Sequence, residues 1–128
     1  MQNVSFSLLV LKTQQLEKLR AFYSKLGIEF CEEQHGDGPT HFAGKVGSAV
    51  LEIYPLPDGG QVDSSTRLGF FVKDLGFVLE SLWRNKFCEL KKAKQTQWGY
   101  RSVVRDPDGR AVELCQQQDD SRPPDEET

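Results

Sequence analysis

Cysteine is scarce in this sequence, and no two cysteines lie close together. Among 128 residues there are three, Cys31, Cys88 and Cys115, with none of the C-x-x-C pairs typical of zinc or redox sites. An odd number of widely spaced cysteines argues against a disulfide framework. We therefore expect three reduced thiols in a cytoplasmic protein.

Long apolar runs are also missing. The longest mostly apolar stretch, residues 6–11, is far shorter than the roughly 20 residues that a membrane span needs. The N-terminus lacks a basic start followed by a long apolar run, which argues against a secretory signal. The sequence therefore predicts no association with membranes.

A basic surface is absent as well. The sequence has 16 lysines and arginines against 19 aspartates and glutamates, a formal net charge of −3. Five of the acids and one base lie in residues 119–128, so residues 1–118 carry a net charge of +1. A nearly neutral body argues against nucleic acid as a partner, because such binding needs clustered positive charge. The acidic segment 119–128 is predicted to be a flexible tail.

The elements that the sequence does predict follow a repeated order. Two segments, residues 13–26 and 73–86, have apolar residues at helical spacing, and a strand-like run precedes each of them. Three strand candidates follow each helix, residues 28–33, 40–43 and 49–54 in the first half and 88–90, 102–105 and 111–115 in the second. The period is near 59 residues. This predicts an α+β fold of two βαβββ modules, about residues 4–55 and 66–117, in a single domain spanning residues 1–118.

Several short motifs within this repeat are typical of one family. They are Leu16–Tyr23 with Leu26-Gly27, Trp98-Gly99, Asp106-Pro107-Asp108-Gly109 and Val112-Glu113-Leu114. With these motifs the sequence resembles the vicinal oxygen chelate superfamily, which includes glyoxalase I, bleomycin-resistance proteins and extradiol dioxygenases. The resemblance covers about residues 4–117 and implies a curved mixed sheet around a cavity. It also implies a small-molecule ligand and admits a homodimer, since the superfamily often pairs its sheets between chains.

Strand alternation predicts which polar side chains face that cavity. In the fourth strand of each module, apolar residues alternate with Glu52 and Tyr54 and with Glu113. In the first strand of the second module, the same alternation leaves Arg67 opposite the apolar face. If the apolar faces pack on the helices, these polar side chains point to the concave side of the sheet. A slip of one residue would reverse the assignment.

Hairpin register extends the predicted cavity. A first turn centred between residues 46 and 47 places His41 opposite Glu52. A second turn centred between residues 107 and 108 places Glu113 opposite Ser102 and close to Arg101. Trp98, where the second hairpin begins, is a further candidate wall residue, although a tryptophan is ordinarily part of a core. The predicted ligand cavity therefore contains His41, Glu52, Tyr54, Arg67, Trp98, Arg101 and Glu113.

The resemblance also implies a divalent metal held by the first and fourth strands of each module. In this sequence those positions fall on Leu8, Glu52, Arg67 and Glu113. Leu8 has no donor atom, and Arg67 places a fixed positive charge where a cation would sit. Because a buried arginine needs a partner, we expect Arg67 to pair with one of the two glutamates. The preferred prediction is therefore no metal bound through Glu52 and Glu113.

A variant metal site stays open as the alternative. It would bind Zn, Ni, Mn or Fe through Glu52, Glu113 and His41, with or without His35. His35 lies in a segment with two glycines and a proline, which could fold over the cavity as a lid or form an exposed turn. The exposed turn is the simpler interpretation.

Three kinds of function remain open at this point. No glycine-rich phosphate loop, nucleophile elbow or Ser/His/Asp arrangement is present, and no catalytic residue can be named. The preferred hypothesis is a binding protein that takes a small polar or aromatic molecule without the usual metal. The alternative is a metal-dependent lyase, isomerase or dioxygenase that uses Glu52 and Glu113. A fold used for association alone is the third.

Overall fold

The structure, a computed structural model of the chain, describes residues 3–118. The predicted tail, residues 119–128, lies outside the described residues. The described elements follow the predicted order. They are β1 (Leu8–Thr13), α1 (Leu16–Ser24), β2 (Phe30–Glu33), β3 (His41–Val46), β4 (Ala49–Pro55), β5 (Leu68–Val72), α2 (Leu75–Arg84), β6 (Lys94–Thr96), β7 (Gly99–Arg105) and β8 (Ala111–Gln116). This order confirms the α+β class and the two βαβββ modules.

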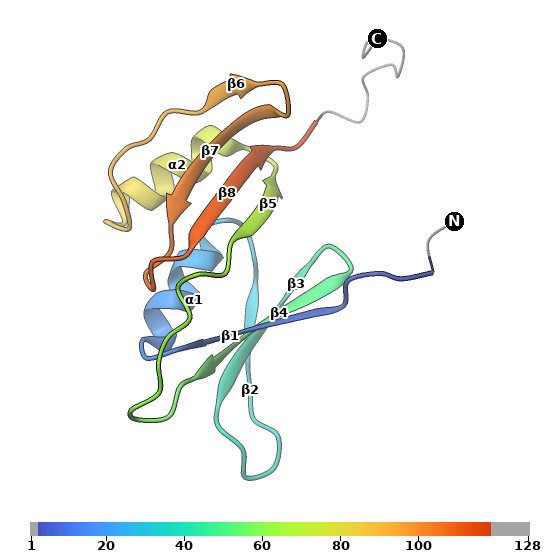
Figure 1. Cartoon of the computed structure of the whole chain (residues 1–128), viewed down its shortest axis with the longest axis vertical. Helices are drawn as coiled ribbons and strands as arrows, with labels where there is room; N and C mark the ends of the chain where they lie inside the picture. The colour runs from blue at the N-terminus through green and yellow to red at the C-terminus, as the bar shows by residue number, and fades with distance from the viewer. Residues whose placement is uncertain (1–2, 119–128) are drawn as a thin grey trace.

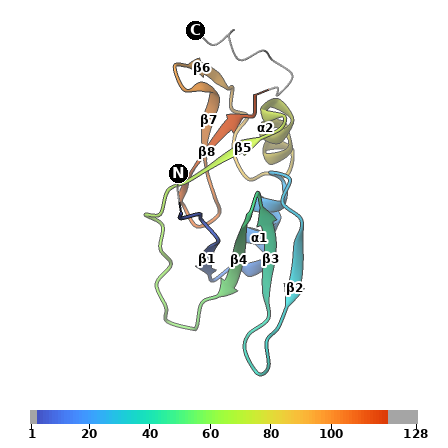
Figure 2. The same ribbon diagram turned by 90° about the vertical axis from the view of Figure 1, so that its right-hand side faces the viewer.

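Each module forms a mixed sheet of four strands. The strand order is β1-β4-β3-β2 in the first module and β5-β8-β7-β6 in the second. In both sheets the first strand pairs in parallel with the fourth, which requires the crossover that the helix supplies. The second sheet lies at the top of Figure 1 and the first at the bottom. Figure 2 shows the connecting residues 56–67 running along one side of both modules.

The helices begin and end at residues that suit their positions. α2 starts at Asp74, whose carboxylate accepts a hydrogen bond from the backbone N–H of Phe77 at 3.0 Å. The turn after α1 reaches Gly27, which has a φ of +111° that a glycine adopts without strain. The Thr13 side chain does not cap α1. Its hydroxyl instead accepts a hydrogen bond from the N–H of Gln15, one residue before the helix.

The core lies between each helix and the inner face of its sheet. The inner residues predicted for the fourth strands are all buried, and they are Leu51, Ile53, Val112 and Leu114. Phe22 of α1 packs edge-on against Phe87, which follows α2, with ring centroids 5.6 Å apart. Buried residues of both modules thus form one apolar cluster. The opposite face of each sheet carries the candidate site residues.

One strand lies elsewhere than predicted. Residues 88–90 form no strand, and β6 occupies Lys94–Thr96 instead. A tight turn decides the position, because Thr96 pairs with Gly99, and its hydroxyl accepts a hydrogen bond from the N–H of Trp98. Gly99 has a φ of +115°, which suits such a turn. Among the described helices, none has the length and apolar character to cross a bilayer.

Candidate functional site

The predicted cavity residues separate into two groups, one on each sheet. The group on the first sheet consists of His41, Glu52 and Tyr54, and the group on the second of Arg67, Trp98, Arg101 and Glu113. Within residues 3–118 no ion pair or hydrogen bond joins the two groups. Of the two glutamates, Glu113 is therefore the partner of Arg67, and Glu52 has separate neighbours on the first sheet.

Glu113 is held between two arginines on the second sheet. Its Oε1 lies 2.6 Å from an Nη2 donor of Arg67 and 2.6 Å from an Nη2 donor of Arg101. The predicted Arg67–Glu113 pair is thus confirmed. The predicted burial is not, because the Arg67 side chain is 60% exposed. The hydrogen bond from Arg67 and the positive charges of both guanidinium groups lower the pKa of Glu113, so this carboxylate stays ionised.

The second hairpin has a register one residue away from the predicted one. Glu113 lies opposite Val103, and Cys115 lies opposite Arg101. The cause is the loop of residues 106–110, whose five residues place its centre at Asp108. Arg101 therefore shares a face with Glu113, whereas Ser102 points to the other side of the sheet.

Two aromatic side chains stand beside the Glu113 group. Trp98 is 69% exposed and Phe71 is 77% exposed, so Trp98 is not part of the core. The Arg101 guanidinium lies 6.0 Å from the centre of the Trp98 ring, at the outer limit of a cation–π contact. An open hollow of about 350 Å³ is lined by Phe71, Trp98, Arg101, Glu113 and Cys115.

His41 and Glu52 are neighbours on the first sheet, as predicted. The His41 Nε2 atom lies 3.9 Å from Glu52 Oε2. The residue directly opposite Glu52 is nevertheless Ala43, because the turn consists of Gly47 and Ser48. The predicted register was off by two residues, and a slip of two keeps every side chain on its face.

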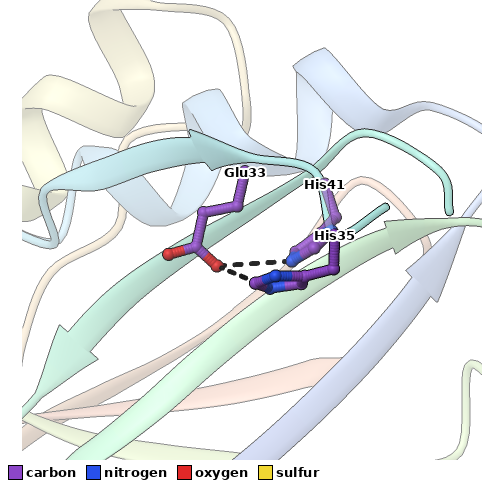
Figure 3. Close-up of side chains that lie close together, drawn as sticks. All are labelled: Glu33, His35 and His41. Carbon is purple, nitrogen blue, oxygen red and sulfur yellow. Dashed lines mark ion pairs between the residues drawn. The ribbon is translucent and has the colours of Figure 1, made fainter. Parts of the chain in front are cut away.

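Glu33 joins this group, although it is not among the predicted site residues. Glu33 and His41 are direct partners in the β2–β3 ladder. The Glu33 Oε1 atom lies 3.4 Å from His41 Nε2 and 3.6 Å from His35 Nε2, as Figure 3 shows. Only the register of β2 against β3 could have identified Glu33 from the sequence. The loop between them, residues 34–40, is too long for a turn type to fix the register.

The loop that follows β2 brings His35 back over His41. Gly36 has a φ of +58°, and the N–H of Gly38 donates to the carbonyl oxygen of His35 at 3.0 Å, which closes a tight turn. The two imidazole rings lie 5.2 Å apart. His35 is an exposed turn residue, as expected, and it also covers the buried ring of His41.

Tyr54 covers the other side of His41. The two rings are stacked, with centroids 4.0 Å apart and an angle of 10° between their planes. Loss of solvent contact and the nearby charges of Glu52 and Glu33 raise the pKa of the Tyr54 hydroxyl. The stacking explains how His41 is 1% exposed on the open face of a sheet.

The four positions at which the resemblance implies a metal do not fit one. Leu8 offers no ligand atom, and Glu113 Oε1 already accepts from two arginines. Glu52 lies on the other sheet, beside His41. We therefore derive no chemical step through a metal at these positions.

Comparisons with known proteins agree with the fold. The antibiotic binding protein TnmS3 from Streptomyces sp. CB03234 has a TM-score of 0.69 at 20% identity, and the alignment covers 92% of this chain and 100% of that one. The bleomycin resistance determinant encoded on the transposon Tn5 has a TM-score of 0.62 at 19% identity, covering 90% and 99%. Lactoylglutathione lyase from Agrobacterium tumefaciens has a TM-score of 0.59 at 18% identity, covering 91% and 96%. These likenesses show the fold alone.

A search of curated proteins found no match. The model of one family, in contrast, matches residues 5–114, which is most of the chain. The two βαβββ modules of the structure agree with that match. The chain therefore belongs to the Glyoxalase/Bleomycin resistance protein/Dioxygenase superfamily.

Proposed function

We propose that the open face of the second sheet binds a small, planar, anionic molecule, and that no metal takes part at the superfamily's usual positions. One observation carries the proposal: Glu113 is held by both Arg67 and Arg101. The group has two positive charges and one negative charge, so it retains a net positive charge. An arginine has five N–H donors, and those not used by Glu113 remain available to a ligand carboxylate or phosphate.

The aromatic side chains and the size of the hollow support the same ligand class. Trp98 and Phe71 present exposed ring surface next to the arginines. Flat apolar surface beside positive charge suits an aromatic ring with an acidic substituent. The hollow of about 350 Å³ lies at the lower end of the range for small-molecule sites, roughly 300–1,000 Å³.

A second copy of the chain is the cover that we propose for this open face. Phe71 and Val103, on the ligand side of the second sheet, are exposed, as are Leu8 and Val10 on the matching side of the first. Apolar side chains gathered on one face favour association. Sedimentation over a range of concentrations tests this. A chain that stays monomeric up to high micromolar concentration would rule out the dimer.

Binding of a matched pair of probes tests the ligand class. We expect 2-naphthoate to raise the unfolding temperature more than its uncharged amide, because a ligand bound only to the native state stabilises it. The variant Arg101→Gln should weaken binding of 2-naphthoate roughly tenfold or more, since hydrogen bonds to charged groups contribute about 1.5–3 kcal/mol. The control is Arg105→Gln, on the same strand but bonded to the carbonyl oxygen of Gly109.

Two results would contradict the proposal. One is an equal response to the naphthoate and the amide. The other is unchanged naphthoate affinity in Arg101→Gln. The alternative function, a metal-dependent lyase, isomerase or dioxygenase that uses Glu52 and Glu113, has less support, because these two carboxylates have separate partners on separate sheets.

A further inference from the structure

Four side chains that could bind a metal gather on the first sheet, whereas the ligand hollow lies on the second. Glu33 ends β2, His35 follows in the loop, His41 begins β3 and Glu52 lies in β4. One ligand atom from each of the first three lies within 4.8 Å of the others. Figure 3 shows both imidazole rings directed at the same carboxylate oxygen of Glu33. Imidazole nitrogens and carboxylate oxygens are donors that Zn²⁺ takes in proteins.

The buried ring of His41 points a free nitrogen into this group. Its Nδ1 lies 3.2 Å from the carbonyl oxygen of Pro39, and a carbonyl can only accept, so Nδ1 carries the proton. Its Nε2 has no hydrogen-bond partner within the described residues, although the side chain is 1% exposed. Metal-binding histidines commonly donate their other ring N–H to a carbonyl in this way.

Without a cation, the arrangement is electrostatically unfavourable. With Nδ1 protonated, the Nε2 of a neutral ring presents a lone pair to the Glu33 oxygen 3.4 Å away. Glu52 adds a second negative charge 3.9 Å from the same nitrogen. Among residues 3–118, neither glutamate forms an ion pair with a lysine or arginine. A positive ion between these atoms would remove the repulsion.

The spacing of the atoms favours tetrahedral coordination. Metal–ligand bonds of about 2.0–2.2 Å, as for Zn²⁺ with histidine and carboxylate, place tetrahedral ligand atoms roughly 3.3–3.6 Å apart. The Glu33 Oε1 atom lies 3.4 Å from one imidazole nitrogen and 3.6 Å from the other. Octahedral ligands at the same bond lengths would be only about 3 Å apart.

We propose that Glu33, His35 and His41 bind one divalent transition metal, Zn²⁺ by this geometry. Glu52 is placed to supply a fourth ligand or to accept a hydrogen bond from a water at that position. The site uses the second strand, the loop and the third strand of the module, and it leaves Glu113 out. It does not depend on the ligand hollow of the second sheet.

Titration of the full chain with Zn²⁺ alone tests the proposal, after dialysis against a chelator. We expect one tightly bound zinc per chain by calorimetry and elemental analysis, and the intense visible absorption of tetrahedral coordination when Co²⁺ replaces it. His35 is 73% exposed, so His35→Gln should fold normally. Loss of a supporting partner weakens metal binding roughly 10–100-fold, so loss of this ligand should weaken it by about 100-fold or more.

The control is Asp37→Asn, which removes a carboxylate from the same loop but outside the group. Asp37→Asn should bind zinc as tightly as the unchanged chain does. Glu33→Gln should lose zinc affinity as His35→Gln does. Absence of zinc binding by the unchanged chain would overturn the proposal. So would full affinity in His35→Gln, or loss of binding in Glu113→Gln alone.

Discussion

A buried group of charges joins the turn between β7 and β8 to the first module. The Arg110 side chain is 1% exposed, and its Nη1 donates to one carboxylate oxygen of Asp106 and one of Asp108, each at 3.1 Å. Its Nη2 donates to the carbonyl oxygen of Lys12 in β1 at 3.2 Å. The Tyr23 hydroxyl, from α1, donates to Asp106 at 2.7 Å. The turn therefore holds the two modules together as well as reversing the chain.

The substitution Arg110→Met tests the energetic role of this group. Methionine keeps an apolar stem of similar reach, but both aspartates then lose their cation while remaining buried. Removing one partner of a buried ion pair costs about 3–5 kcal/mol. A domain is stable by only about 5–15 kcal/mol in total, so the loss is a large share. At roughly 3–4 °C per kcal/mol for this chain length, we expect the unfolding temperature to fall by ~10–20 °C.

Urea denaturation and scanning calorimetry measure the effect. Arg105→Met is the matched control, because Arg105 lies at the start of the same turn and is exposed. Among residues 3–118, its side chain donates only to the carbonyl oxygen of Gly109. We expect the control to cost less than about 1 kcal/mol. If Arg110→Met loses no more free energy of unfolding than Arg105→Met, the buried group does not hold the modules together and the reasoning is refuted.

Two further predictions concern alkaline pH and strand glycines. Burial and the adjacent aspartate raise the pKa of Tyr23 well above its ordinary value of 10.0, so the native state keeps a proton that the unfolded chain releases. The free energy of unfolding should therefore fall as pH rises above 10, and Tyr23→Phe should flatten that slope in urea titrations; an identical slope would contradict this. Gly44→Ala should lower the free energy of unfolding, measured in urea, by about 1–3 kcal/mol, because the new Cβ would lie 2.6 Å from Ile28 Cγ2. Gly69→Ala is the control and should be tolerated, because the atom nearest to its new Cβ is 3.9 Å away. Equal stability of the two alanine variants would contradict this prediction and show that β3 shifts to accommodate the extra methyl group.

The faces of the strands could be predicted from the sequence, but their registers could not. Alternation placed Glu52 and Glu113 on the open faces correctly, because that assignment depends only on neighbouring residues within one strand. Register depends on the conformation of the connecting loop. The expected turn positions missed it by two residues at residues 47–48 and by one at residues 106–110. The second error put Ser102 on the wrong face.

The contacts that join distant segments escaped prediction for a related reason. Tyr23 and Asp106 are 83 residues apart, and no local pattern of hydrophobicity records how one module docks on the other. The motif Asp106–Gly109 was recognised as a turn and as part of a family resemblance, yet the burial of its carboxylates depends on Arg110. Glu33 was missed because its partner lies across a loop of residues 34–40.

The repeat nevertheless shows how two equivalent glutamates came to have different chemistry. Glu52 and Glu113 occupy the same place in the fourth strand of each module, opposite Val10 and Gly69 in the first strand. Around Glu113 the module supplies arginines, which neutralise the carboxylate and leave positive charge for an anion. Around Glu52 the first module supplies His41, and Glu33 adds negative charge that attracts a cation. Because the two groups share no partner within the described residues, a substitution in one should leave ion binding by the other unchanged. That independence distinguishes two sites in one chain from a single shared one.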